Sequence, residues 1–127
     1  MPDANGNRGL VSIYTRAGSK WVVRQTIHDP NNTAVDFFTG SSLSSDGNTA
    51  LLTAADVQEG LGSSVSIYVR SGNTWTPQQT LHEPSGGTVN DAFGDGVLSS
   101  DGNTALVPAV LASGGGRVFV FHRTGTT

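Results

Sequence analysis

The sequence predicts an all-β fold made of four-stranded antiparallel units, and three observations lead to this prediction. A nonamer, LSSDGNTAL, occurs at residues 43–51 and again, unchanged, at residues 98–106. Its Asp-Gly pair separates two apolar runs, which is a hairpin signal because glycine accepts the positive φ that a two-residue turn demands. The composition agrees, since the chain contains 17 glycines, many Ser and Thr, and few helix-forming residues.

A period near 54 residues extends well beyond the nonamer. The first and second copies share the pairs Val11/Val65, Ile13/Ile67, Tyr14/Tyr68, Trp21/Trp75, Gln25/Gln79 and His28/His82. A third, partial copy adds Val118, Val120 and Arg123, which stand 53 positions after their counterparts in the second copy. Such a period indicates one supersecondary unit that stacks against copies of itself.

The complete copy is expected to contain four strands. We place them at residues 38–43, 49–54, 65–70 and 75–81, with tight turns at 46–47 and 71–73 and a polar loop at 55–63. Apolar residues alternate with others in the third strand, which is the period of a β-strand. Pro77 lies inside the fourth strand, and proline cannot donate to a ladder, so this strand is expected at a sheet edge.

Four strands per repeat at this period are typical of β-propeller blades. We therefore interpret residues 1–127 as a single repeat domain of about two blades. It comprises a partial blade at residues 1–30, a full blade at 36–84 and a partial blade at 91–127. The first part is expected to supply the third and fourth strands (10–16 and 21–27). The last part is expected to supply strands one to three, ending with 117–123.

Three further motifs point to a known repeat family. They are Phe93-Gly94, the run DGNTALV at residues 101–107, and a fourth strand that carries Trp and Gln. On these motifs the repeat resembles the FG-GAP (integrin-α-like) β-propeller repeat in its bacterial form. The first copy departs from the family at Phe38-Thr39, and the family's Gly-Ala-Pro is replaced by other residues in both copies. The resemblance implies the propeller fold and leaves function open, because propellers host many activities.

The acidic residues are candidate cation ligands. Some FG-GAP repeats bind calcium through an Asp-x-Asp-x-Asp-Gly loop, and this chain contains no such run. Asp46 and Asp101 are interpreted as turn residues. The alternative is a cation held by Asp91 or Asp95 together with loop carbonyls, since calcium needs six or more oxygens. We predict no metal and no cofactor.

The repeated histidines and arginines are interpreted as structural or solvated residues. His28 and His82 occupy equivalent positions in different blades, too far apart to share an ion. Arg16, Arg70 and Arg123 are equivalent residues on successive blades, and solvated strand-end charges are favoured over a ring of arginines on one face. No Ser/His/Asp set has a plausible spacing, and the chain has no cysteine nucleophile. The sequence therefore assigns no catalytic residue, and the protein is predicted not to be an enzyme.

The two tryptophans leave two functions open. Trp21 and Trp75 open the fourth strands, where a repeated indole packs between blades or stacks on a sugar ring. The first reading is a non-enzymatic, self-assembling propeller module with a structural, adhesive or surface-display role. The alternative is a glycan-binding lectin with pockets between blades.

The remaining expectations concern partners and location. A net charge of −3 without a Lys/Arg block argues against nucleic acid, and no stretch approaches the roughly 20 apolar residues of a membrane span. The N-terminal residues lack the features of a signal peptide. The expected location is nevertheless extracellular or the cell surface.

Self-association follows from the strand count. Two blades cannot close a ring, because propellers need about 4–8. Copies are therefore expected to meet head to tail, the C-terminal strands of one being completed by the fourth strand of the next, in a closed ring or a filament. The strands expected to meet carry Val11, Ile13, Trp21, Val118 and Val120. The alternative is a piece of a longer propeller.

Overall fold

Three antiparallel β-sheets make up the part of the chain that the computed structural model describes, residues 9–28, 36–56, 63–84, 92–112 and 114–125. The strands are β1 (Leu10–Ala17), β2 (Lys20–His28), β3 (Asp36–Leu43), β4 (Thr49–Asp56), β5 (Ser64–Ser71), β6 (Thr74–Leu81), β7 (Val97–Leu98), β8 (Thr104–Ala109) and β9 (Arg117–His122). Sheet A has the order β1-β2, sheet B β3-β4-β5-β6 and sheet C β7-β8-β9. The predicted all-β, antiparallel class is confirmed. In the described ranges no helix is long and apolar enough to cross a membrane.

The middle sheet contains the four strands that the sequence predicted for the complete copy. Its strands follow chain order, so β3 and β6 are its edges. Pro77 lies in β6 opposite Tyr68, and the predicted edge position of this strand is confirmed. An edge accommodates proline because the missing N–H costs no ladder bond when it faces away from the neighbouring strand.

β2 and β6, which take the fourth place of the repeat in sheets A and B, each contain a β-bulge near the middle. The register shifts between Ile13 and Tyr14 in the β1–β2 pair, and between Ile67 and Tyr68 in the β5–β6 pair. An extra residue turns the side chains beyond it to the other face of the sheet. As a result Leu81 packs toward sheet C, whereas Trp75, on the other side of the bulge, packs toward sheet A.

The first two strands of the repeat meet the turn where the sequence predicts. β3 ends at Leu43 and β4 begins at Thr49, but all of residues 44–48 form the connection instead of a two-residue turn at 46–47. The predicted positive φ is correct, with values of 67° at Gly47 and 71° at Gly102. The turn is wider because Ser44 and Thr49 close it, with Ser44 N donating to Thr49 O at 3.0 Å.

The first strand of the third copy is shorter than predicted. Only Val97–Leu98 forms β7, and Phe93 adds an isolated bridge to Ala109. Between them Gly94 and Asp95 have positive φ values of 146° and 51°, which interrupt an extended strand. A Cβ at Gly94 would collide with the methyl group of Thr53 on β4. The close approach of the two sheets therefore replaces the regular ladder here.

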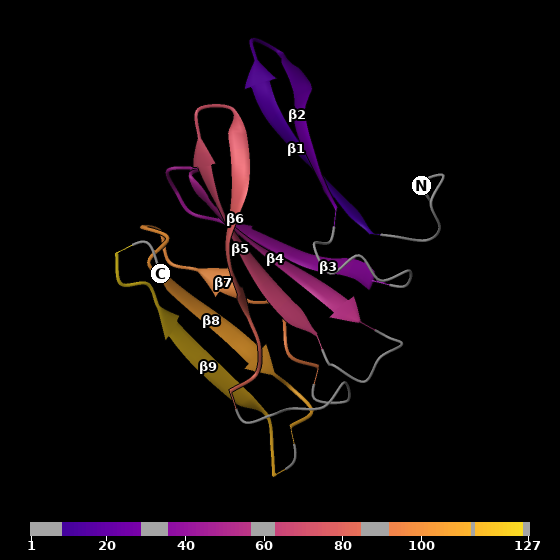
Figure 1. The fold of residues 1–127 in the computed structure, drawn as a ribbon, viewed down its shortest axis with the longest axis vertical. Helices are drawn as coiled ribbons and strands as arrows, with labels where there is room; N and C mark the ends of the chain where they lie inside the picture. Colours follow the sequence, from indigo (N-terminus) through magenta and orange to yellow (C-terminus); the bar gives the residue numbers. More distant parts are fainter. Residues whose placement is uncertain (1–8, 29–35, 57–62, 85–91, 113, 126–127) are drawn as a thin grey trace.

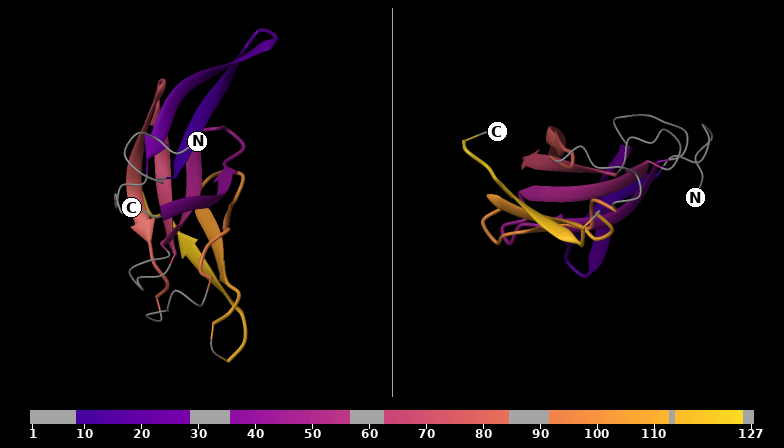
Figure 2. Two further views of the ribbon diagram at one scale, coloured as in Figure 1. Left: turned by 90° about the vertical axis from the view of Figure 1, so that its right-hand side faces the viewer. Right: turned by 90° about the horizontal axis from the view of Figure 1, so that it is seen from below.

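Sheet B lies between the other two sheets, and each of its faces is covered by apolar side chains. Figure 1 shows the β1–β2 hairpin at one end and sheet C at the other, and Figure 2 shows sheets B and C as separate layers. The cluster between sheets A and B contains Ile27, Ala50, Leu52, Tyr68 and Trp75. The cluster between sheets B and C contains Leu51, Val65, Leu81, Phe93, Ala105, Val107, Ala109 and Ala112. Among the described residues, sheets A and C are thus each covered on one face only.

Candidate functional site

The acidic residue of the nonamer is occupied by its own turn. Asp46 Oδ1 accepts hydrogen bonds from Ser44 Oγ at 2.6 Å and from the backbone amide of Asn48 at 2.9 Å, while Oδ2 accepts from Asn48 Nδ2 at 3.2 Å. The Ser44 hydroxyl and then the Asn48 amide lower the pKa of Asp46 below its ordinary 3.8, because both bonds favour the charged form. The second nonamer repeats this arrangement around Asp101, whose pKa is also lowered, first by Ser99.

Two of the three equivalent arginines hold these turns. Arg70 on β5 donates from Nε and Nη2 to Asn48 Oδ1 at 3.1 and 2.9 Å. Arg123 donates in the same way to Asn103 Oδ1 at 3.0 and 2.8 Å. Arg16 donates instead to the carbonyl of Gly18 at 2.8 Å. Arg70 and Arg123 thus differ from the solvated charges that the sequence predicts, because Asn48 and Asn103 bind their guanidinium groups. The signal that would have revealed the contact is the pairing of each nonamer Asn with an Arg on the third strand.

The potential metal ligands remain dispersed. His28, His82 and His122 are exposed, and His122 Nδ1 lies 3.2 Å from Thr104 Oγ1. Asp95 is exposed, and its Oδ1 accepts a hydrogen bond from Thr39 Oγ1 at 3.3 Å. Asp91 lies outside the described residues. Within the described ranges no three His, Asp or Glu side chains gather closely enough to hold a metal ion.

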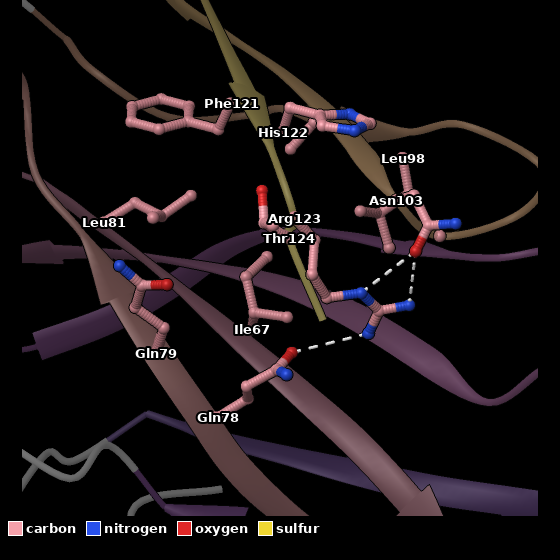
Figure 3. A pocket seen from close by; sticks show the side chains of 12 residues that line it. Ile67, Gln78, Gln79, Leu81, Leu98, Asn103, Phe121, His122, Arg123 and Thr124 are labelled. Atoms are coloured by element: carbon pink, nitrogen blue, oxygen red, sulfur yellow. Dashed lines mark hydrogen bonds between the residues drawn. The ribbon is translucent and has the colours of Figure 1, made fainter. Parts of the chain in front are cut away.

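Two pockets lie at equivalent positions between successive sheets. A cavity of about 300 Å³ separates sheets A and B, and one of about 380 Å³ separates sheets B and C. Six lining residues of the first have repeat counterparts in the second: Ile13/Ile67, Ile27/Leu81, Leu43/Leu98, Gly47/Gly102, Ala50/Ala105 and Arg70/Arg123. The larger cavity, named here the B–C pocket, is shown in Figure 3, where Gln79 and Leu81 of β6 lie on one side and Phe121 and Arg123 on the other.

A glutamine amide joins the fourth strands of sheets A and B. Gln25 Nε2 donates to the carbonyl of Trp75 at 3.0 Å, and the amide of Trp75 donates to Gln25 Oε1 at 2.8 Å. Both bonds go to backbone atoms of β6 on the side that does not pair with β5. The repeat counterpart of Gln25 is Gln79, which is exposed beside the B–C pocket.

The two tryptophans differ sharply in exposure. The side chain of Trp75 belongs to the cluster between sheets A and B and the residue is 6% exposed, whereas Trp21 is 67% exposed. Trp75 therefore packs between sheets and offers no free ring face. Trp21 lies on the face of sheet A that no described residue covers, so any sugar stacking would fall to it.

The other predicted association residues also differ in their exposure to solvent. Val118 and Val120 are 61% and 66% exposed on the outer face of sheet C, although the counterpart of Val118, Val65, is completely buried. Val11 and Ile13 are only half exposed and pack against the cluster between sheets A and B. The structure therefore places Trp21, Val118 and Val120 at the two ends of the molecule, and Val11 and Ile13 in an internal contact.

Searches against protein-family models, curated proteins and solved structures found no match for the chain. The likeness to the FG-GAP repeat accordingly rests on the sequence motifs alone.

Proposed function

We propose that the protein is a non-enzymatic, self-assembling β-propeller module with a structural, adhesive or surface-display role, located outside the cell or on its surface. Each chain would contribute about two blades, and head-to-tail contact would complete a ring or a filament. The proposal includes that the repeat is of the FG-GAP type, on the strength of its sequence motifs.

One observation carries the proposal: the residues exposed at the two ends are repeat counterparts of residues that are buried inside. Trp21 and Val118 are largely exposed, and their counterparts Trp75 and Val65 are buried between sheets. Exposed apolar faces of this kind favour association. A copy placed end to end would bury Trp21 and Val118 in contacts of the type that the chain already makes internally.

The convergence of the first strands supports the propeller geometry. Strands β3 and β7 come from different sheets, and Ser42 Oγ accepts a hydrogen bond from the amide of Leu98 at 3.1 Å. The nonamer turns of the two sheets also touch, since the amide and hydroxyl of Ser45 both donate to the carbonyl of Ser100 at 2.9 Å. Blades arranged around a central channel bring their first strands together in this way.

Light scattering at micromolar concentration tests the assembly. We expect a mass that is a multiple of 13.1 kDa and that falls on dilution. A well-folded, soluble 13.1 kDa monomer at this concentration would refute self-assembly.

Glycan binding is the second candidate, and two observations favour it. The B–C pocket places Asn103, His122 and Arg123 beside the ring of Phe121, a combination of polar groups and an apolar face that suits a sugar. Trp21 adds an exposed indole elsewhere on the surface. A glycan array tests this candidate, with Trp21→Ala and Phe121→Ala as the variants; binding that neither variant weakens would exclude both places.

A further inference from the structure

The B–C pocket has a counterpart between sheets A and B, where, among the described residues, the indole of Trp75 is part of the lining. Between sheets A and B, the fourth strand β6 pairs with β5 and turns the indole of Trp75 against Ile27 and Ala50. Between sheets B and C the matching residues are Leu81 and Ala105, which are buried and line the larger of the two cavities with no indole beside them. In the described ranges β9 is the edge of sheet C, and no strand pairs with its outer side.

Gln79 is the second observation that points to a place for a further strand beside β9. Its counterpart Gln25 bonds both backbone groups of Trp75, the residue that opens β6. Gln79 lines the cavity on the exposed side of β6, and no hydrogen bond of its side chain occurs within the described ranges. A strand paired with β9 would bring backbone N–H and C=O groups to Gln79 in the way that β6 brings them to Gln25.

We propose that the B–C pocket is a docking site for β2 of a second copy of this chain, and that the Gln79 side chain recognises the backbone of this strand. β2 is the repeat counterpart of β6, so it carries Trp21 where β6 carries Trp75. Pairing with β9 in the register that β6 uses with β5 places the Trp21 indole against Leu81 and Ala105. The Gln79 amide then bonds the N–H and C=O of Trp21. This mode of recognition is β-strand addition, in which main-chain bonds provide affinity and one pocket provides specificity.

Docking requires β2 to exchange partners, since it pairs with β1 in its own chain. β9 is already held by β8 over the register from Thr104↔His122 to Ala109↔Arg117, whereas β1 has only β2 as a ladder partner in the described sheets. The exchange gives Trp21 a buried place and adds two bonds to Gln79. The inference rests on the proposed self-assembly and specifies the strand and the residue that would carry it.

A synthetic peptide of residues 20–28 tests the docking without the competing strand β1. The receptor is the full chain carrying Trp21→Ala, so that its own β2 cannot fill the pocket with an indole. Fluorescence anisotropy of the labelled peptide should show saturable binding. Adding Gln79→Ala to the receptor should weaken it about tenfold, the effect of losing one or two hydrogen bonds. Adding Thr76→Ala, an exposed change on the same strand outside the pocket, should leave binding unchanged.

Backbone methylation of the peptide provides a control that does not touch the protein. Methylation of the Trp21 backbone nitrogen removes the N–H that would donate a hydrogen bond to Gln79 Oε1. It should weaken binding by a similar factor. Methylation at Val23 should be tolerated, because the counterpart of Val23 in β6 is Pro77, which has no N–H.

The possible results separate this inference from the proposed assembly. Absence of saturable peptide binding, or equal binding to the Gln79→Ala receptor, would overturn the docking site, even if the wild-type chain assembles. Gln79-dependent peptide binding by a chain that stays monomeric would support the docking site and overturn self-assembly.

Discussion

The nonamer turn is a small network in which each polar side chain satisfies a neighbour. The Asp46 carboxylate bonds the residues around it, and Arg70 fastens the turn to the third strand through Asn48. Asp101, Asn103 and Arg123 do the same in sheet C. The invariance of the nonamer within this chain thus has a local physical reason, because the Ser, Asp, Gly and Asn each perform one task in the turn.

The two turn glycines are predicted to differ in their tolerance of alanine. Both have φ near 70°, a conformation that costs an L-residue about 1–2 kcal/mol. A Cβ at Gly47 meets open space, whereas one at Gly102 would lie 2.8 Å from Thr49 Oγ1 and 3.2 Å from Ser44 Cβ. Urea unfolding should therefore show a larger loss of stability for Gly102→Ala than for Gly47→Ala. Gly18→Ala, with φ 61° and open space, is the matched control; equal losses at Gly47 and Gly102 would contradict the contact between the turns.

Acid should weaken the fold through the two turn carboxylates. Their folded-state pKa values lie below the ordinary 3.8, so the ionised groups stabilise the fold fully above that value. The contribution is lost as the pH falls from there through the lower folded pKa. The double variant Asp46→Asn, Asp101→Asn retains an oxygen acceptor and no longer titrates. Its free energy of unfolding should depend less steeply on pH below about 4 than that of the wild type. An unchanged slope would place the acid sensitivity elsewhere.

Removal of divalent cations should leave the melting temperature unchanged. Asp46 and Asp101 direct their oxygens at hydrogen-bond donors of their own turns, which leaves them poorly placed for the six or more oxygens that calcium requires. Differential scanning fluorimetry with and without EDTA measures this. A fall of several degrees that calcium reverses would contradict the expectation, and Asp91 and Asp95 would then be the first residues to substitute.

At the scale of elements, the fourth strand serves two neighbouring sheets. The bulge near its middle sends Trp75 to one neighbour and Leu81 to the other. The side chain of Gln25 then ties one fourth strand to the next through backbone atoms. Contacts directed at the backbone depend little on the partner's side chains, so a glutamine at this position can accept different neighbouring strands.

Gln25→Ala should loosen the hairpin of sheet A from sheet B. It removes two partly buried hydrogen bonds, which predicts a loss of about 1–3 kcal/mol. Hydrogen exchange should report faster exchange of the Trp75 amide, which donates to Gln25 Oε1. Thr26→Ala, an exposed change on the same strand, is the control and should exchange like the wild type. Unaltered protection of the Trp75 amide in Gln25→Ala would show that the strand, and not the glutamine, shields it.

The strands of sheet B were predictable because their signals are local: alternation around Ile67, turn residues at Gly47 and a proline at the edge. The short β7 was not, because its interruption comes from the approach of Gly94 to Thr53 on another sheet. The Asn–Arg contacts were also missed, although the sequence contains a signal for them, since Asn48 and Arg70 recur together as Asn103 and Arg123. The bond from Gln25 to Trp75 spans 50 residues and joins groups that carry no motif beyond their repetition.

For the whole molecule, the proposed association would use the open faces of sheets A and C. Val118 and Val120 occupy the positions of Val65 and Ile67, which sheet C covers in the middle sheet. The same kind of cover is expected for the outer face of sheet C when copies meet.

Charge on the outer face of sheet C should therefore separate the copies without unfolding them. Val118→Lys with Val120→Lys places two like charges where the proposed contact would desolvate them, while both side chains are already largely exposed in the single chain. Light scattering should report the mass of a monomer, and circular dichroism should retain the β-sheet spectrum. Thr76→Lys, exposed on β6, is the control and should leave the assembly intact. An assembly that survives the double substitution would exclude this face.

The glycine at position 94 has a consequence for the order in which the chain folds. Two hairpins carry the same nine residues, so a folding intermediate can offer either hairpin to either place, and repeat proteins are prone to such misassembly. The place taken by the second hairpin requires a φ of 146° against β4, which Gly94 adopts. Thr39 stands at the matching position of the first hairpin and is sterically barred from that conformation. The missing side chain at position 94 therefore disfavours the exchanged arrangement, in which Thr39 would have to stand against Thr53 of β4.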